Sequence, residues 1–230
     1  DVRAAVNGLN ATLSWKSPIL ADKTLTWSNG EKGKAMGGTS GTVRKIWAVN
    51  AFSSDELASY ADHKITAINV MLNSAVTEMR LVILENSKIV YSQQVSAEEI
   101  AALEVHKWAK MALTTPYVID PSAELSYGYY VVHAADLFPG LLDSGPAISG
   151  ACFISTSTAK SDFDTTVPSW TNIEAAANAN WMLSADVEAQ SEIKTPVVKD
   201  YTVYRDGVEV KSGITGLTYT EELAPGTYTY

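Results

Sequence analysis

Short segments in which apolar and polar residues alternate recur along this chain, and each ends at a turn signal. A period of two is the pattern of a half-buried strand, because successive side chains of a strand point to opposite faces. Val, Ile and Thr, which favour pleated surfaces, make up 54 of the 230 residues. The clearest segments are 65–70, 79–84, 88–91, 108–113, 125–132, 150–155 and 181–187. Many short strands at this spacing predict an all-β sandwich.

Two short helices are expected between these strands. Ser54 to Tyr60 begins with a capping residue and carries acids in its first turn, the pattern of a helix start. Residues 96–99 read Ser-Ala-Glu-Glu, a capping box. Asn86-Ser87 lies between two strand patterns and predicts a hairpin turn.

Composition bounds the class of protein. At 46% hydrophobic and 19% charged, the chain is expected to form a globular core, in one or two domains. The net charge of −9, with no basic cluster longer than Arg44-Lys45, argues against a nucleic-acid partner. No run of about 18 apolar residues occurs, so no membrane span is predicted. A single cysteine excludes an intrachain disulfide.

The two ends of the chain carry motifs of their own. Residues 11–18 read Ala-Thr-Leu-Ser-Trp-Lys-Ser-Pro, and residues 201–207 read Tyr-Thr-Val-Tyr-Arg-Asp-Gly, in which Asp-Gly is a strong hairpin signal. Residues 223–228 read Leu-Ala-Pro-Gly-Thr-Tyr. In this order the motifs resemble the second strand, the third strand and the tyrosine corner of a fibronectin type III domain. The resemblance implies that Tyr228 is the corner residue.

The spacing of these motifs predicts an unusual domain organisation. About 180 residues separate the first two motifs, so either a whole domain is inserted between them or the ends belong to different modules. The ends sum to 53 residues, whereas such a sandwich needs roughly 100, which favours pairing of the ends with each other. We therefore predict a domain at 19–195 inserted into an incomplete one made of 1–18 and 196–230. A missing final strand would leave an open sheet edge for self-association.

The middle of the chain also has a familiar order of motifs. They are Thr26–Gly30, Asp55–Tyr60, Val90–Val95, Pro116–Asp120, Tyr127–Tyr129 and Asn180–Leu183. Over about 160 residues they resemble jelly-roll-like modules of large secreted or surface-anchored bacterial proteins. The resemblance implies a secreted or cell-surface location and carries no activity with it. The chain starts without methionine and stops within a strand pattern, so we expect a fragment of a longer protein.

The residues capable of catalysis or metal binding form no recognisable constellation. Cys152 lies in an apolar strand pattern and is expected in the core, with a cysteine hydrolase using His106 or His133 as the alternative. These histidines and His63 lack zinc-ligand spacing. Ca²⁺ is a candidate cofactor, because it binds oxygen ligands and four acids lie in stretches that read as loops. The alternative is an ordinary solvated acidic loop. Those acids are Asp162, Asp164, Asp136 and Asp143.

Aromatic residues beside polar ones are the strongest binding candidates, because flat rings pack against the apolar face of a sugar. We propose Trp27, Trp170 with Asn172, and Tyr127 with Tyr129 on one face of a strand; Tyr130 would face the other side. Packing under a loop is the alternative for each of them. The other tryptophans lie in strand patterns and are expected in the core, namely Trp15, Trp47, Trp108 and Trp181.

Three functions remain open at this point. The favoured one is a non-catalytic extracellular adhesion, interaction or spacer module of a larger bacterial surface protein, with a glycan or surface protein as partner. The second is a carbohydrate-binding module attached to a secreted enzyme. The third is a glycoside hydrolase on a jelly-roll scaffold, which needs two suitably spaced acids. Each acidic pair has a local structural explanation, such as the capping box at Glu98-Glu99, so we expect no enzyme.

Overall fold

The computed structural model describes residues 2–15, 22–37, 44–157, 169–190 and 200–230. Within these residues the secondary structure is antiparallel strands with three helices of four or five residues and one 3-10 turn. The predicted all-β fold class is therefore confirmed. No helix in the described ranges is both long and apolar enough to cross a membrane.

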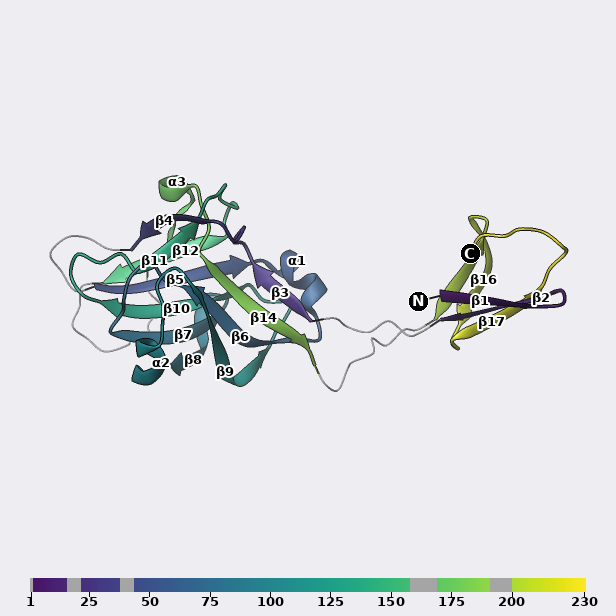
Figure 1. The fold of residues 1–230 in the computed structure, drawn as a ribbon, viewed down its shortest axis with the longest axis horizontal. Helices are drawn as coiled ribbons and strands as arrows, with labels where there is room; N and C mark the ends of the chain where they lie inside the picture. The colour runs from purple at the N-terminus through teal and green to yellow at the C-terminus, as the bar shows by residue number, and fades with distance from the viewer. Residues whose placement is uncertain (1, 16–21, 38–43, 158–168, 191–199) are drawn as a thin grey trace. The chain divides into compact units, whose positions relative to one another are not determined.

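The chain divides into two compact units (Figure 1). The larger unit is Asp22–Gln190, and the smaller unit combines Asp1–Ala21 with Ser191–Tyr230. Segments from the two ends of the chain thus fold together, and the sequence between them forms the other unit.

The larger unit is a sandwich of two main sheets. The six-stranded sheet contains, in spatial order, β13 (Thr171–Asn172), β12 (Cys152–Ser157), β5 (Arg44–Phe52), β10 (Leu125–His133), β7 (Glu78–Glu85) and β8 (Lys88–Gln94). The four-stranded sheet contains, in spatial order, β3 (Lys23–Thr26), β14 (Leu183–Ala189), β6 (His63–Met71) and β9 (Trp108–Val118). A small third sheet pairs β4 (Lys32–Met36) with β11 (Gly140–Asp143). The chain changes main sheet between β5 and β6, β6 and β7, β8 and β9, β9 and β10, and β13 and β14.

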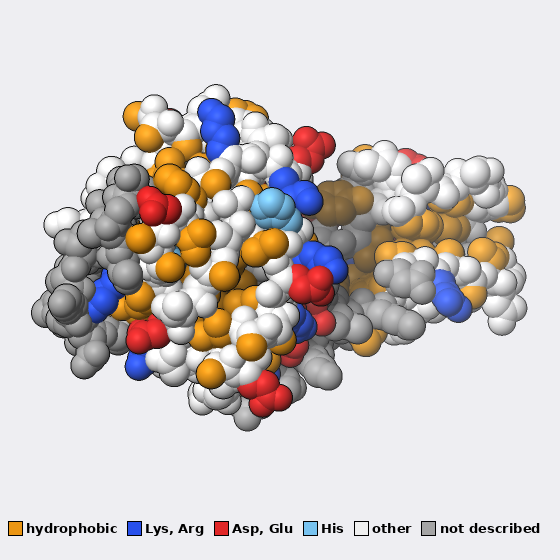
Figure 2. Space-filling view, turned by 60° about the vertical axis from the view of Figure 1, so that its left-hand side comes forward, with side chains coloured by type: hydrophobic (Ala, Val, Ile, Leu, Met, Phe, Trp, Pro, Cys, Tyr) orange, Lys and Arg blue, Asp and Glu red, His pale blue; other side chains and the backbone are white. Residues whose placement is uncertain are grey.

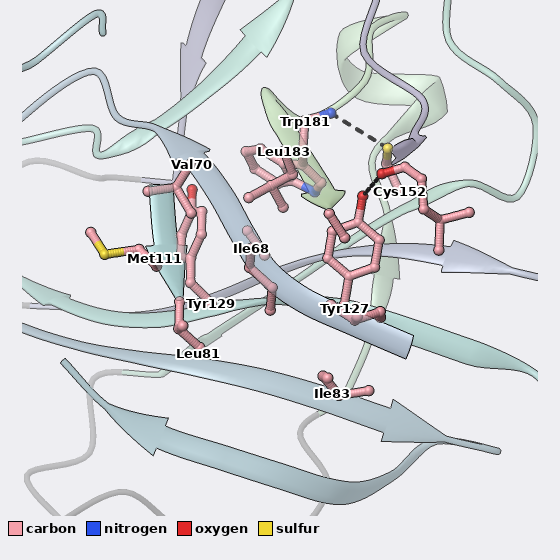
Figure 3. Packing of buried hydrophobic residues seen from close by; sticks show 14 of the residues in the cluster. Ile68, Val70, Leu81, Ile83, Met111, Tyr127, Tyr129, Cys152, Trp181 and Leu183 are labelled. Atoms are coloured by element: carbon pink, nitrogen blue, oxygen red, sulfur yellow. Dashed lines mark hydrogen bonds between the residues drawn. The ribbon is translucent and has the colours of Figure 1, made fainter. Parts of the chain in front are cut away.

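Apolar side chains from both main sheets fill the space between them. Figure 3 shows Tyr127 and Tyr129 of β10 packed among Ile68 of β6 and Leu81 of β7. Each of these side chains is at most 1% exposed. The alternation along β10 and β6 therefore places one set of side chains in the core, as the period-two pattern predicts.

Short helices connect some of the strands. They are α1 (Ser54–Leu57), which continues into the 3-10 turn η1 (Ala58–Tyr60), α2 (Ala97–Ala101) and α3 (Glu174–Ala177). Both expected helices are present, and α2 has the predicted capping box, with Glu99 accepting from the backbone N–H of Ser96 at 2.8 Å. The capping residue of α1 is Ser53, one position earlier than expected. The third helix was not expected, because it is a single turn with no capping side chain.

The smaller unit has two small sheets. One contains β1 (Val2–Asn7), β2 (Asn10–Trp15) and β17 (Thr218–Glu222), and the other pairs β15 (Tyr201–Arg205) with β16 (Val208–Ile214). The rings of Trp15 and Tyr201 meet edge to face, with centroids 5.2 Å apart. Asp206 and Gly207 both have positive φ in the turn between β15 and β16, as the hairpin signal predicts.

The smaller unit buries little apolar surface. Its buried hydrophobic residues in the described ranges are Ala11, Leu13 and Val203, and Figure 2 shows hydrophobic side chains gathered along its surface. An apolar groove of about 380 Å³ lies between its sheets, against Trp15 and Tyr201. Among the described strands, β15 has a neighbour on one side only.

The hydroxyl of Tyr228 donates to the carbonyl oxygen of Ala224 at 3.0 Å.

Candidate functional site

Loops at one end of the six-stranded sheet enclose a cleft of about 520 Å³, which we call the loop cleft. Its lining comes from residues 51–54 and Glu56 around the start of α1, Asn86 in the β7–β8 turn, Ser122 and Glu124 before β10, and residues 149–151 before β12. These loops meet because their strands are neighbours: Leu125 of β10 pairs with both Phe52 of β5 and Glu85 of β7. Strand register thus assembles the cleft from four distant parts of the chain.

A smaller hollow of about 100 Å³ adjoins the loop cleft, and we call it the aromatic hollow. It is lined by Trp170, Phe153, Val49, Leu84, Ser87, Ser126 and Glu124. Glu124 lines both spaces, so the two share this residue. We call the two spaces together the combined site, and its lining includes both apolar groups and hydroxyl, amide and carboxylate groups.

The Trp170 ring is held by a cluster on the outer face of the six-stranded sheet. It is half-buried and meets Trp47 of β5 edge to face, with ring centroids 6.4 Å apart. Trp47 in turn packs on Tyr130 of β10, with centroids 5.0 Å apart. Both supporting rings are at most 5% exposed, so they fix Trp170 from below. The part of Trp170 that remains exposed faces the aromatic hollow.

Several polar groups in the loop cleft have no partner among the described residues. The exposed carboxylate of Glu124 forms no hydrogen bond or ion pair with them, and neither does the hydroxyl of Ser54. The side-chain oxygen of Asn86 accepts from the backbone N–H of Glu124 at 3.2 Å, which leaves the Asn86 amide nitrogen unengaged. Glu56 differs, because its carboxylate accepts from the backbone N–H and the hydroxyl of Ser53 at 2.7 and 2.8 Å. The unengaged groups are therefore an acceptor carboxylate, a donor amide and a hydroxyl.

Of the residues predicted to bind a ligand, Trp170 lies at this site. Asn172 lies two residues further along, and its side-chain oxygen accepts from the backbone N–H of Glu174 at 2.7 Å, at the start of α3. Its carbonyl group therefore has a structural task.

Trp27 does not line the loop cleft, but it supports two residues that do. Its ring stacks on Phe52 at 4.6 Å, and its indole N–H donates to the carbonyl oxygen of Ala51 at 2.8 Å. Phe52 belongs to the inner core, whereas Trp47 belongs to the outer-face cluster under Trp170. Because positions 47 and 52 of β5 point to opposite faces, Trp27 and Trp170 lie on opposite sides of the six-stranded sheet.

Tyr127 and Tyr129 belong to the core, which corrects the expectation that they form a ligand-binding face. Both are at most 1% exposed (Figure 3). The hydroxyl of Tyr127 donates to the carbonyl oxygen of Leu25 at 2.5 Å. Burial raises the pKa of both phenols well above the ordinary value. The alternation itself held, since Tyr130 packs on the opposite face of the sheet.

The residues considered for catalysis lie elsewhere. Cys152 is buried, donates to the side-chain oxygen of Asn50 at 3.2 Å, and has a pKa raised by burial to about 12. Its thiol is therefore protonated and part of the core, as expected. His63 and His133 are fully buried, whereas His106 is bonded to the Asn73 side chain at 2.9 Å.

The acids considered for Ca²⁺ do not form a cation site in the part of the chain that the structure describes. Asp162 and Asp164 lie outside the described residues. Asp143 is 1% exposed, and its two oxygens accept four N–H bonds, from Asn29, Gly145 and twice from Asn180. No group of three metal-ligating side chains occurs in the described ranges. N–H donors therefore engage both oxygens of the Asp143 carboxylate.

Two features of the surface escaped prediction from sequence. Glu124 carries only a weak signal, a polar position just before a strand, and its place beside Trp170 depends on strand register. Trp108, expected in the core, is 43% exposed on the outer face of the four-stranded sheet, so that expectation was wrong. The reason is parity: Met111 and Leu113 take the inward positions of β9, which turns Trp108 and Lys110 outward.

The lining of the two spaces combines a partly exposed aromatic ring with hydroxyl, amide and carboxylate groups. A pyranose has an apolar C–H face that packs on an aromatic ring and a rim of hydroxyls that need donors and acceptors. No protein-family model matches this chain, and no curated protein matches it in sequence. A proposal for the ligand therefore rests on the geometry of the loop cleft and the aromatic hollow.

Proposed function

We propose that the chain is a non-catalytic, extracellular interaction module of a larger bacterial surface protein, and that the loop cleft with the aromatic hollow binds a glycan. The observation that carries the proposal is the exposed side of Trp170 next to the unengaged groups of Glu124 and Asn86. The location rests on the resemblance of the middle of the chain to jelly-roll-like modules of secreted or surface-anchored bacterial proteins, together with the resemblance of the end motifs to fibronectin type III strands. The bond from Tyr228 to Ala224 supports that resemblance, since a corner tyrosine bonds to the backbone a few residues upstream.

Binding without hydrolysis is the form of this function that the carboxylates support. A glycoside hydrolase needs two carboxyl groups that act on opposite sides of one bond. The cleft is lined by two glutamates, but the Glu56 carboxylate is engaged by Ser53 at the start of α1. One free carboxylate, Glu124, then serves as a hydrogen-bond acceptor for a ligand. An adhesive role and a carbohydrate-binding role attached to an enzyme elsewhere share this surface.

The test is a glycan array followed by titration calorimetry with the best ligand. Trp170→Ala should weaken binding about tenfold, because a sugar–aromatic contact contributes on the order of 1.4 kcal/mol. Trp170→Phe should retain most of the affinity, since it keeps a flat ring over Trp47. Circular dichroism on both variants separates lost binding from lost folding.

Trp108→Ala is the matched control, because Trp108 is also an exposed tryptophan but lies on the four-stranded sheet. It should bind with the affinity of the unchanged protein. If no glycan binds at all, or if the Trp108 variant loses binding while the Trp170 variants keep it, the proposal is overturned.

We also propose weak self-association through the smaller unit. The supporting observation is that β15, among the described strands, has one unpaired side next to an apolar groove. Sedimentation at increasing concentration tests this, with Tyr204→Lys as the disrupting change, because Tyr204 lies on β15, is 53% exposed and lines the groove. A chain that stays monomeric at every concentration contradicts the proposal.

A further inference from the structure

We propose that Glu124 makes this site selective for glycans that carry free amino groups and that it disfavours glycans with carboxylate or sulfate groups. This inference rests on the proposed function, because it names the ligand class of the same cleft. Glu124 lines both the loop cleft and the aromatic hollow, so a sugar packed on Trp170 would lie next to its carboxylate.

The charge of the lining points in one direction. The charged side chains that line the two spaces are Glu56 and Glu124, and no described Lys or Arg lines either space. Ser149, at the rim, is itself bonded to a third acid, Glu174, at 3.1 Å. A negatively charged ligand would lie near these carboxylates without a compensating cation. Repulsion between like charges is unfavourable even when the groups are exposed to solvent.

The unengaged carboxylate of Glu124 can attract an ammonium group of the ligand. It forms no hydrogen bond or ion pair with the described residues, so no existing contact is lost when an ammonium group approaches. The neighbouring donor, the Asn86 amide, and the hydroxyl of Ser54 remain for the hydroxyls of the same sugar. An amino sugar thus matches all three features of the site: the ring, the neutral polar groups and the charge.

The experiment compares four short probes on the full chain by calorimetry: a glucosamine tetramer, an N-acetylglucosamine tetramer, a galacturonate tetramer and tetralysine. The glucosamine tetramer should bind about three- to fivefold tighter than its N-acetylated form, the effect of one exposed ion pair. The galacturonate tetramer should bind most weakly. Raising the salt concentration should reduce the preference for the amino sugar, because exposed charges are screened.

Glu124→Gln should bring the ratio between the two glucosamine-based tetramers to about one, because the amide keeps an acceptor oxygen and loses the charge. Glu98→Gln, on the exposed face of α2 away from the lining, is the matched control and should keep the ratio.

The outcomes separate this inference from the proposed function. If the N-acetylated or the acidic tetramer binds as tightly as the amino tetramer through Trp170, glycan binding stands and the selectivity is overturned. If tetralysine binds as tightly as the amino sugar and Trp170→Ala does not affect either, the site attracts any cation and the amino-sugar assignment fails. If no saccharide of any kind binds, both proposals fail together.

Discussion

Removing the Asp143 carboxylate should destabilise the larger unit strongly. Asp143 ends β11, and its oxygens accept the backbone N–H groups of Asn29, Gly145 and Asn180 at 3.0, 2.9 and 2.8 Å. The side-chain amide of Asn180 is the fourth donor, at 3.1 Å. One buried carboxylate thereby joins three loops around the small β4–β11 sheet.

The magnitude follows from which donors would be left without a partner. Asn180 is 2% exposed, so its two N–H groups would stay buried and unsatisfied in Asp143→Ala, at about 1–3 kcal/mol each. Asn29 and Gly145 lie where water can reach them and add less. We expect a loss of about 3–5 kcal/mol in the free energy of unfolding. Asp143→Asn keeps one of the two acceptor oxygens and should lose roughly half of that.

The assay is urea unfolding followed by tryptophan fluorescence, which reports on the larger unit because five of the six tryptophans lie in it. Glu78→Gln, an exposed acid at the start of β7, is the control and should change the free energy of unfolding by less than about 0.5 kcal/mol. A loss below about 1 kcal/mol for Asp143→Ala would refute the reasoning. So would an increase in stability on adding Ca²⁺, because the four donors leave no role for a cation.

Two further predictions concern single groups. The Cys152 thiol is buried, and burial raises its pKa to about 12. It should therefore not react with a thiol reagent in the native protein at about pH 8, but it should react fully in urea. Rapid labelling of the native protein would contradict its place in the core. Burial alone would raise the pKa of Asp186, but bonds from Lys110, 2.7 Å away, and from Asn69 hold it below its ordinary value. Its contribution to stability is therefore fully present above the unfolded pKa and is lost as the pH falls below about 4, so Asp186→Asn should flatten that part of the stability–pH curve. An unchanged curve would show that the ion pair contributes nothing.

Local patterns predicted local structure well in this chain. The alternating segments became strands, and the hairpin signal at Asn86-Ser87 became a turn in which both residues have positive φ. The capping box at Ser96 and Glu99 appeared as predicted, because its two hydrogen bonds join residues only three positions apart. Each of these features depends on neighbours in the sequence, which is why no tertiary information was needed.

The direction in which a strand faces was harder to predict. Alternation placed Tyr127 and Tyr129 together and Tyr130 opposite, but it did not say which face would be packed against the second sheet. Tyr127 and Tyr129 lie on the inner face of β10, and both are therefore buried. In β9 the same uncertainty exposed Trp108, because Met111 and Leu113 took the inward positions.

What the sequence by itself determined is the all-β class, the positions of the strands and turns, and the presence of Trp170 in a loop with room for exposure. The tertiary structure decided which aromatic rings reach the surface and which polar groups stand beside them. Glu124 and Trp170 are 46 positions apart, and they line the same hollow because β10 and β12 both pair with β5, while β13, which follows Trp170, pairs with β12. Strand register is a property of paired strands rather than of one, and for that reason the site could be seen only in the folded chain.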